Sequence, residues 1–186
     1  MLVSVDWEGI AEEATPGDLL RLRPDAAARI WPDPEDARFA VRFGVPYSDG
    51  LFRILPDLAE RDPASPETAF AEEVGPEPVD TPHGRMQPLG ELYQADVYVR
   101  LDDGTIWVSD PDAEVEYELI HQDLSSLSYL VYKVAVEKPL PEEDPTPHDW
   151  AEVEEIIRED VTAWDRLPFE SGAQFWNAYM ESYPML

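Results

Sequence analysis

Residues 95–109 read ADVYVRLDDGTIWVS, and this stretch decides the fold class. Apolar and polar side chains alternate in its first half, with Val97 and Val99 on one face and Tyr98 on the other. Such alternation is typical of a β-strand with one buried face. The DDG triplet at 102–104 has the composition of a tight turn, and residues 105–109 return as a second apolar run. The stretch therefore predicts a β-hairpin.

A third strand is predicted directly after the hairpin, because residues 112–119 alternate again. One face carries the apolar side chains of Ala113, Val115, Tyr117 and Leu119. The other face carries the carboxylates of Asp112, Glu114, Glu116 and Glu118. Four like charges side by side repel one another, so an acidic strand face needs an explanation.

Three amphipathic helices are predicted after the strands. Asp123 or Ser125 is placed to cap the first, Thr146 with Pro147 starts the second, and the SGAQ capping-box pattern at 171–174 starts the third. Their apolar anchors are Leu127, Leu130, Val131 and Val134 in the first, Trp150, Val153, Ile157, Val161 and Trp164 in the second, and Phe175, Trp176 and Tyr179 in the third. Strands in the middle and helices towards the ends predict an α+β fold, with a single domain covering residues 1–186.

The first half of the chain is less regular. The apolar run at 19–22 predicts one or two helical turns after the turn-forming residues Thr15 to Asp18. Prolines recur from Pro63 to Pro88. Because proline is excluded from helix interiors and from central strands, most of that segment is expected to be irregular loop.

The charge of the chain restricts its partners. Its 41 acidic and 13 basic side chains give a formal net charge of -28. A protein that binds DNA, RNA or an anionic membrane needs clustered lysine and arginine, so neither partner is expected. A basic protein is the partner that this charge favours. The chain has no cysteine, no signal-peptide pattern and no apolar run long enough for a membrane span, so we expect a cytoplasmic protein.

No motif for catalysis or metal binding stands out. His83, His121 and His148 lie in separate segments, and we expect them on the surface or in loops. The acids of residues 110–121 resemble a calcium loop, but Val115 replaces the required glycine and His121 the required glutamate. No nucleophile elbow, phosphate loop or dinucleotide fingerprint occurs. We therefore predict no enzyme, no cofactor and no metal.

Three acidic groups are candidate docking surfaces for a basic partner. The predicted partner-binding residues are Asp112, Glu114, Glu116 and Glu118 on the strand and Glu142, Glu143 and Asp144 in the following loop. A third group, Glu152, Glu155 and Glu159, falls on the outer face of the Trp150 helix. Each group alone is also explained as an ordinary solvated face. Together they favour a surface that complements a positive partner.

Several short motifs resemble the SUKH superfamily of bacterial immunity proteins, and its fourth family above all. They are GVP at 44–46 followed by Leu51-Phe52, LGEL at 89–92 before the strand 96–101, DGTIW at 103–107 and SSLSYL at 125–130. The resemblance covers roughly residues 38–138. It implies a central, mostly antiparallel sheet flanked by helices.

The resemblance also implies a function, which is to bind and block a toxin, often a nuclease or a nucleic-acid deaminase. Such toxins tend to be basic because they grip phosphates, so an acidic antidote complements them. No catalytic residue is carried over from the family. The alternative from charge alone is an acidic interaction or scaffold module without a toxin partner.

Overall fold

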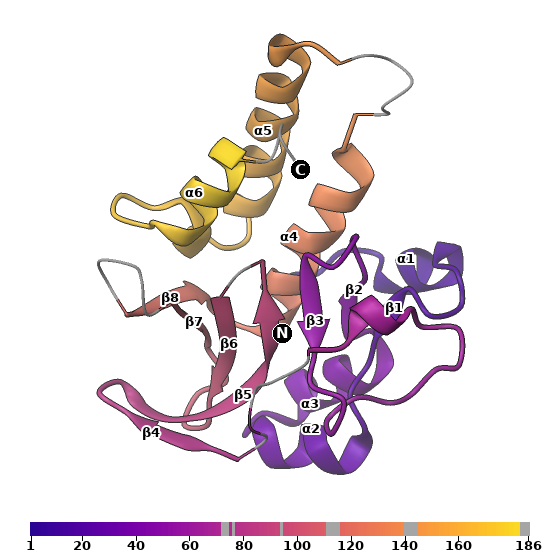
Figure 1. Ribbon diagram of the computed structural model, residues 1–186, viewed down its shortest axis with the longest axis vertical. Helices are drawn as coiled ribbons and strands as arrows, with labels where there is room; N and C mark the ends of the chain where they lie inside the picture. The colour runs from indigo at the N-terminus through magenta and orange to yellow at the C-terminus, as the bar shows by residue number, and fades with distance from the viewer. Residues whose placement is uncertain (72–74, 76, 94, 111–115, 140–144, 183–186) are drawn as a thin grey trace.

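Six strands form an antiparallel sheet in the computed structural model, which describes residues 1–71, 75, 77–93, 95–110, 116–139 and 145–182 (Figure 1). The strands are β3 (Phe52–Ile54), β4 (Val79–Thr81), β5 (Gly84–Leu92), β6 (Ala95–Arg100), β7 (Ile106–Ser109) and β8 (Tyr117–His121). Their order is β3-β5-β6-β7-β8, and β4 pairs with the first part of β5. A separate two-stranded sheet joins β1 (Leu19–Leu20) to β2 (Val45–Pro46).

Helices from both ends of the chain flank this sheet. They are α1 (Trp7–Glu13), α2 (Pro24–Ile30), α3 (Pro34–Arg42), α4 (Leu124–Glu137), α5 (Pro147–Thr162) and α6 (Phe175–Ser182), with the short 3-10 helices η1 (Glu67–Ala69) and η3 (Leu167–Phe169). Figure 1 shows α4, α5 and α6 together at one end of the molecule, away from α2 and α3. The predicted α+β fold with an antiparallel sheet and flanking helices is confirmed.

The predicted hairpin is β6–β7. Val97 pairs with Val108 and Tyr98 with Trp107, so the two faces of the hairpin are those that the alternation predicted. In the connecting turn, Arg100 Nε donates a hydrogen bond to Asp103 Oδ1 at 2.9 Å.

The sheet has a separate apolar cluster on each face. Val97, Val99, Ile106, Val108 and Ile120 belong to the main core, which also contains the apolar stripe of α4. On the other face Met86, Tyr98 and Trp107 form a smaller cluster, against which Tyr117 and Leu119 pack. The ring of His83 stacks on Trp107 at 4.7 Å between centroids, so Trp107 is buried.

Two glycines of the recognised motifs are required by close approaches of the backbone. Gly44 has a φ of +66°, and a Cβ there would lie 2.1 Å from the carbonyl oxygen of Leu20. A Cβ on Gly90 would lie 1.9 Å from the carbonyl oxygen of Arg53 on β3. Any larger residue at either position would therefore separate strands that are paired in the fold.

Two expectations about the first half of the chain are wrong, namely the helical turns at 19–22 and the exclusion of proline from central strands. Residues 19 and 20 form β1 and not helical turns, because they pair with β2. The proline-rich segment contains β4 and the start of β5, and Pro88 lies inside that central strand. Pro88 sits beside a bulge, between the part of β5 that pairs with β4 and the part that pairs with β3, and proline is tolerated at such an interruption. Helices α1, α2 and α3 were not predicted.

Candidate interaction surface

The carboxylate of Glu118 holds the start of α6. It accepts hydrogen bonds from the backbone N–H groups of Gln174 at 2.8 Å and Phe175 at 3.0 Å. Helix starts leave such N–H groups without partners within the helix, and a negative charge is favourable there. The prediction that Ser171 starts this helix is wrong, because α6 begins at Phe175 and a strand residue 57 positions away caps it.

The alternation predicted for the third strand holds over its described part, but Glu118 does not lie on the outer face of the sheet. Tyr117 and Leu119 pack on the open side of the sheet, while Glu118 and Ile120 face the side that the core and α6 cover. Glu116 is exposed. The other predicted partner-binding residues, Asp112, Glu114, Glu142, Glu143 and Asp144, lie outside the described residues.

Replacing Glu118 separates its structural role from a docking role. We expect Glu118→Ala to lower the free energy of unfolding by about 1–2 kcal/mol, because two N–H groups at the start of α6 lose their acceptor. Glu116→Ala is the matched control, since Glu116 is exposed, and it should change stability by less than about 0.5 kcal/mol. Chemical denaturation of the two variants measures both values. Equal effects would contradict the capping role.

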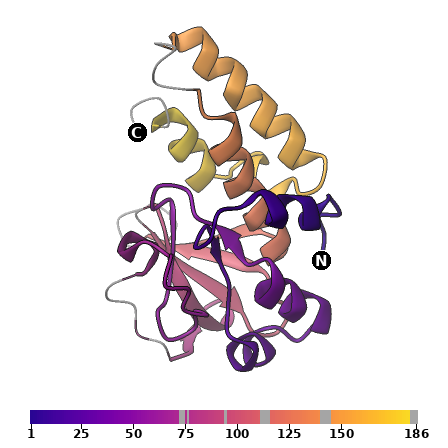
Figure 2. The ribbon, with the colours of Figure 1, turned by 90° about the vertical axis from the view of Figure 1, so that its right-hand side faces the viewer.

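The α5 acidic face, formed by Glu152, Glu155 and Glu159, is an exposed acidic group on a described helix. The three side chains are spaced three and four residues apart, all are exposed, and Figure 2 shows α5 as the outermost helix at its end of the molecule. The predicted start of the helix is confirmed, because Thr146 and Asp149 form a capping box. The prediction of an acidic outer face on this helix is confirmed.

Cations near α5 are already engaged with other carboxylates. Lys133 pairs with Asp160 at 2.7 Å and also with Glu137, and Arg158 donates to Glu154 at 2.8 Å. Within the described ranges no cation pairs with the α5 acidic face. Its three charges are therefore available to an incoming partner.

Two apolar side chains of the same region are partly open to solvent. Ile156 and Trp164 are each 37% exposed. The prediction that Trp164 is a core anchor is wrong, because α5 ends at Thr162 and the chain turns before the stripe reaches it. Trp150 packs against the core and Trp176 is buried, as predicted.

A buried polar network joins β8 to the C-terminal helices. Asp165 accepts hydrogen bonds from the backbone N–H groups of Gln122 at 2.9 Å and Leu167 at 3.1 Å, and from Ser126 Oγ at 2.7 Å. The Nδ1 atom of His121 lies 2.7 Å from Ser126 Oγ, and Trp176 Nε1 donates to His121 Nε2 at 3.0 Å. His121 and Asp165 are fully buried. The expectation of a surface or loop histidine is therefore wrong for His121, whereas His83 and His148 are exposed.

The charge states in this network follow from its geometry. His121 Nε2 accepts the Trp176 hydrogen bond and so carries no proton, and burial lowers the pKa of this histidine. Burial alone would raise the pKa of Asp165, but the contact with His121 and the hydrogen bonds from Gln122 and Ser126 hold it well below its usual range. The network thus contains a neutral imidazole and an ionised carboxylate.

Serine, histidine and aspartate also form the catalytic triad of many hydrolases, but this arrangement differs in chemistry. In a triad the serine donates to histidine Nε2 and the aspartate binds Nδ1. Here Nε2 is occupied by the indole of Trp176, and Ser126 donates its proton to Asp165. Ser126 is 1% exposed, so no substrate reaches it. The network connects β8, α4, η3 and α6, and its role is structural.

Because His121 is neutral when folded, the stability of the protein should depend on pH. Its folded pKa is lowered, so stability is present above the unfolded value near 6.5 and is lost as the pH falls below it, by about 1.4 kcal/mol per pH unit. Chemical denaturation between pH 7.5 and pH 5 measures this slope. We expect His121→Gln to reduce the slope relative to wild type, while the exposed control His148→Gln retains it. A slope that His121→Gln leaves unchanged would contradict the neutral assignment.

The described residues contain no metal site and no membrane helix. Across the ranges that the structure describes, no three His, Asp or Glu side chains converge to hold a metal ion. None of the helices described there is long and apolar enough to cross a membrane.

The sequence model of one protein family, the SUKH-4 immunity proteins, matches residues 5–182 of the chain. The chain belongs to the SUKH-4 immunity protein family. No curated protein and no solved structure matches it. The match extends the resemblance from residues 38–138 to nearly the whole chain, including α5 and α6.

Membership of the SUKH-4 family implies toxin neutralisation, and hence a cognate toxin as partner. Immunity proteins of this kind are generally not catalysts. The buried Ser126–His121–Asp165 network agrees with that view, since its atoms are closed to solvent.

Proposed function

We propose that this SUKH-4 protein neutralises a basic, nucleic-acid-targeting toxin in the cytoplasm, and that it acts by binding and without catalysis. The observation that carries the proposal is the exposed and unpaired α5 acidic face on a chain of net charge -28. An enzyme that grips phosphates presents cations on its surface. The negative charges of the α5 acidic face complement such surface cations.

Electrostatic attraction also gives the speed that an antidote needs. A toxin that enters or is made in the cell acts from the moment it is free, so the antidote has to capture it quickly. Complementary surface potentials raise association rates well above those of neutral proteins, and salt screens the effect. Apart from Glu118, whose carboxylate binds the start of α6, the predicted docking residues on the strand and in the 142–144 loop are our candidates for the contact, together with the α5 acidic face.

Affinity capture tests the proposal. The tagged chain is incubated at low salt with lysate of the source organism and eluted with rising salt, and a bait with lysine at positions 152, 155 and 159 serves as the matched control. We expect a basic protein that is released by salt, retained less well by the control bait, and inhibited by the purified chain in a nuclease or deaminase assay. Capture of no basic protein, or of one that the chain does not inhibit, would count against the proposal and favour an acidic scaffold module.

A further inference from the structure

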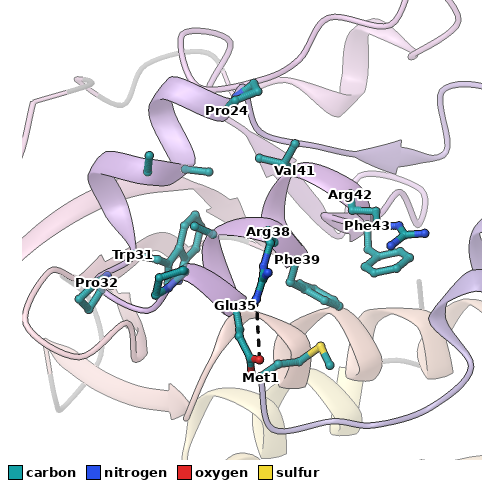
Figure 3. A pocket seen from close by; sticks show the side chains of 14 residues that line it. Met1, Pro24, Trp31, Pro32, Glu35, Arg38, Phe39, Val41, Arg42 and Phe43 are labelled. Carbon is teal, nitrogen blue, oxygen red and sulfur yellow. Dashed lines mark ion pairs between the residues drawn. The ribbon is translucent and has the colours of Figure 1, made fainter.

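A groove lined mainly by apolar side chains lies between α2 and α3 and is closed at one end by Met1 (Figure 3). Its volume is about 870 Å³, which is the size of a site that takes several side chains of a partner. The apolar lining includes Pro24, Ala28, Trp31, Ala37, Phe39 and Val41. Trp31 and Phe39 are buried, whereas Ala28 is exposed on the wall of the groove.

Two arginines and one glutamate, Glu35, line this groove, although the chain as a whole is strongly acidic. Five of the 13 basic residues lie between Arg21 and Arg42, together with only four acidic residues. Arg38 and Arg42 line the groove itself (Figure 3). The groove is therefore a local exception to the negative surface, and the general charge argument does not describe what binds there.

Arg38 is only weakly engaged within the protein. Its nearest carboxylate is Glu35 at 3.8 Å, and the two side chains are 74% and 65% exposed. Exposed pairs at that distance contribute little, so Arg38 is available to a stronger acceptor. Arg42 differs, because it forms a close pair with Glu8 at 2.7 Å.

Trp31 gives the groove a fixed floor. Its ring lies against the turn at Gly104, where a Cβ would come within 3.0 Å of the indole. The indole N–H is buried and has no hydrogen-bond partner in the described part of the chain. This N–H is closed to solvent beside the Gly104 turn, so Trp31 offers the groove the apolar surface of its ring and no polar contact.

We infer that the groove receives an apolar segment of the toxin that carries a carboxylate beside its apolar side chains, with that carboxylate facing Arg38. The inference rests on the proposed function and adds a second, chemically different contact to the acidic faces. Apolar burial would supply affinity here, while the acidic faces supply the rate of encounter. A second copy of the chain fits less well, because a symmetric contact would bring the arginines of two grooves together.

Three single variants test the inference against the purified toxin from the capture experiment. Arg38→Glu reverses the charge in the groove, and Ala28→Trp fills it with a side chain. Arg29→Glu is the matched control, because Arg29 is exposed on α2, does not line the groove, and undergoes the same change of charge. All three positions are exposed, so circular dichroism and thermal melting should match wild type.

The direction in which Arg38→Glu changes Kd distinguishes a specific contact in the groove from general electrostatic attraction. A more acidic chain attracts a basic toxin more strongly, so general electrostatics predicts tighter binding for both charge variants. We expect instead that Arg38→Glu and Ala28→Trp raise Kd about tenfold or more, and that Arg29→Glu leaves Kd unchanged or lower. Tighter binding by Arg38→Glu, or a Kd within about threefold of wild type for Ala28→Trp, would overturn the inference.

Failure of the inference differs from failure of the proposed function. If wild type binds and inhibits the toxin but the groove variants do so equally well, the groove is not the contact and the proposed function stands. If wild type inhibits no toxin, the proposed function fails and the inference falls with it. Sedimentation of the chain alone is expected to give a monomer. A dimer that Ala28→Trp dissociates would show that the groove binds a second copy of the chain and not the toxin, and would overturn the inference.

Discussion

Replacing Asp165 by alanine is expected to lower the free energy of unfolding by about 3–5 kcal/mol, because several donors lose a charged acceptor and each buried donor left unpaired costs about 1–3 kcal/mol. The variant leaves the N–H groups of Gln122 and Leu167 and the hydroxyl of Ser126 without their acceptor inside the protein. It also removes the charge beside His121. Because the network joins β8, α4, η3 and α6, its loss should destabilise the whole C-terminal part of the fold.

Chemical denaturation followed by circular dichroism measures this loss. Asp57→Ala is the control, because Asp57 is an exposed aspartate, and it should change the stability by less than about 0.5 kcal/mol. Asp165→Asn gives a second comparison that keeps the size of the side chain. A loss below about 1 kcal/mol in Asp165→Ala would show that the network is not a structural centre.

Reversing the charge of the α5 acidic face is expected to slow association with a basic toxin by on the order of ten- to a hundredfold at low salt. The variant carries lysine in place of Glu152, Glu155 and Glu159. Its association rate should also depend less on salt than that of wild type, because steering by surface charge is screened. Stopped-flow measurements over a series of salt concentrations give both quantities.

A second triple variant separates a local contact from the overall charge. Lysine in place of the exposed Glu12, Glu13 and Glu60 changes the net charge by the same amount at positions outside α5. We expect this control to slow association much less. If both triple variants slow it equally, the whole field of the protein steers the toxin and α5 has no special part.

Local patterns in the sequence predicted the elements whose cause is local. The hairpin followed from alternation and the DDG turn, and α4 and α5 followed from their caps and from apolar residues on one face. The place of Pro88 in a central strand was not predicted, because it depends on tertiary pairing. Pro88 lies between the part of β5 that pairs with β4 and the part that pairs with β3, where no partner on that side needs its N–H. The run at 19–20 was misjudged because its partner, β2, lies 25 residues further on.

The candidate site shows the same division. The exposed acids of α5 follow from helical spacing, which is a property of the segment itself. The roles of Glu118 and His121 could not be predicted, because their partners Gln174 and Asp165 are distant in the sequence and meet them only in the fold. The groove between α2 and α3 was missed for a related reason, since those short helices are stabilised by tertiary packing more than by their own propensity.

Cell survival tests the central claim, that the chain neutralises a toxin by binding it. Cells carry an inducible gene for the toxin from the capture experiment, with either this chain or an unrelated acidic protein of similar size produced beforehand. We predict that cells with this chain grow and that cells with the unrelated protein die. Death in both cultures, with this chain present in excess and soluble, would contradict the claim.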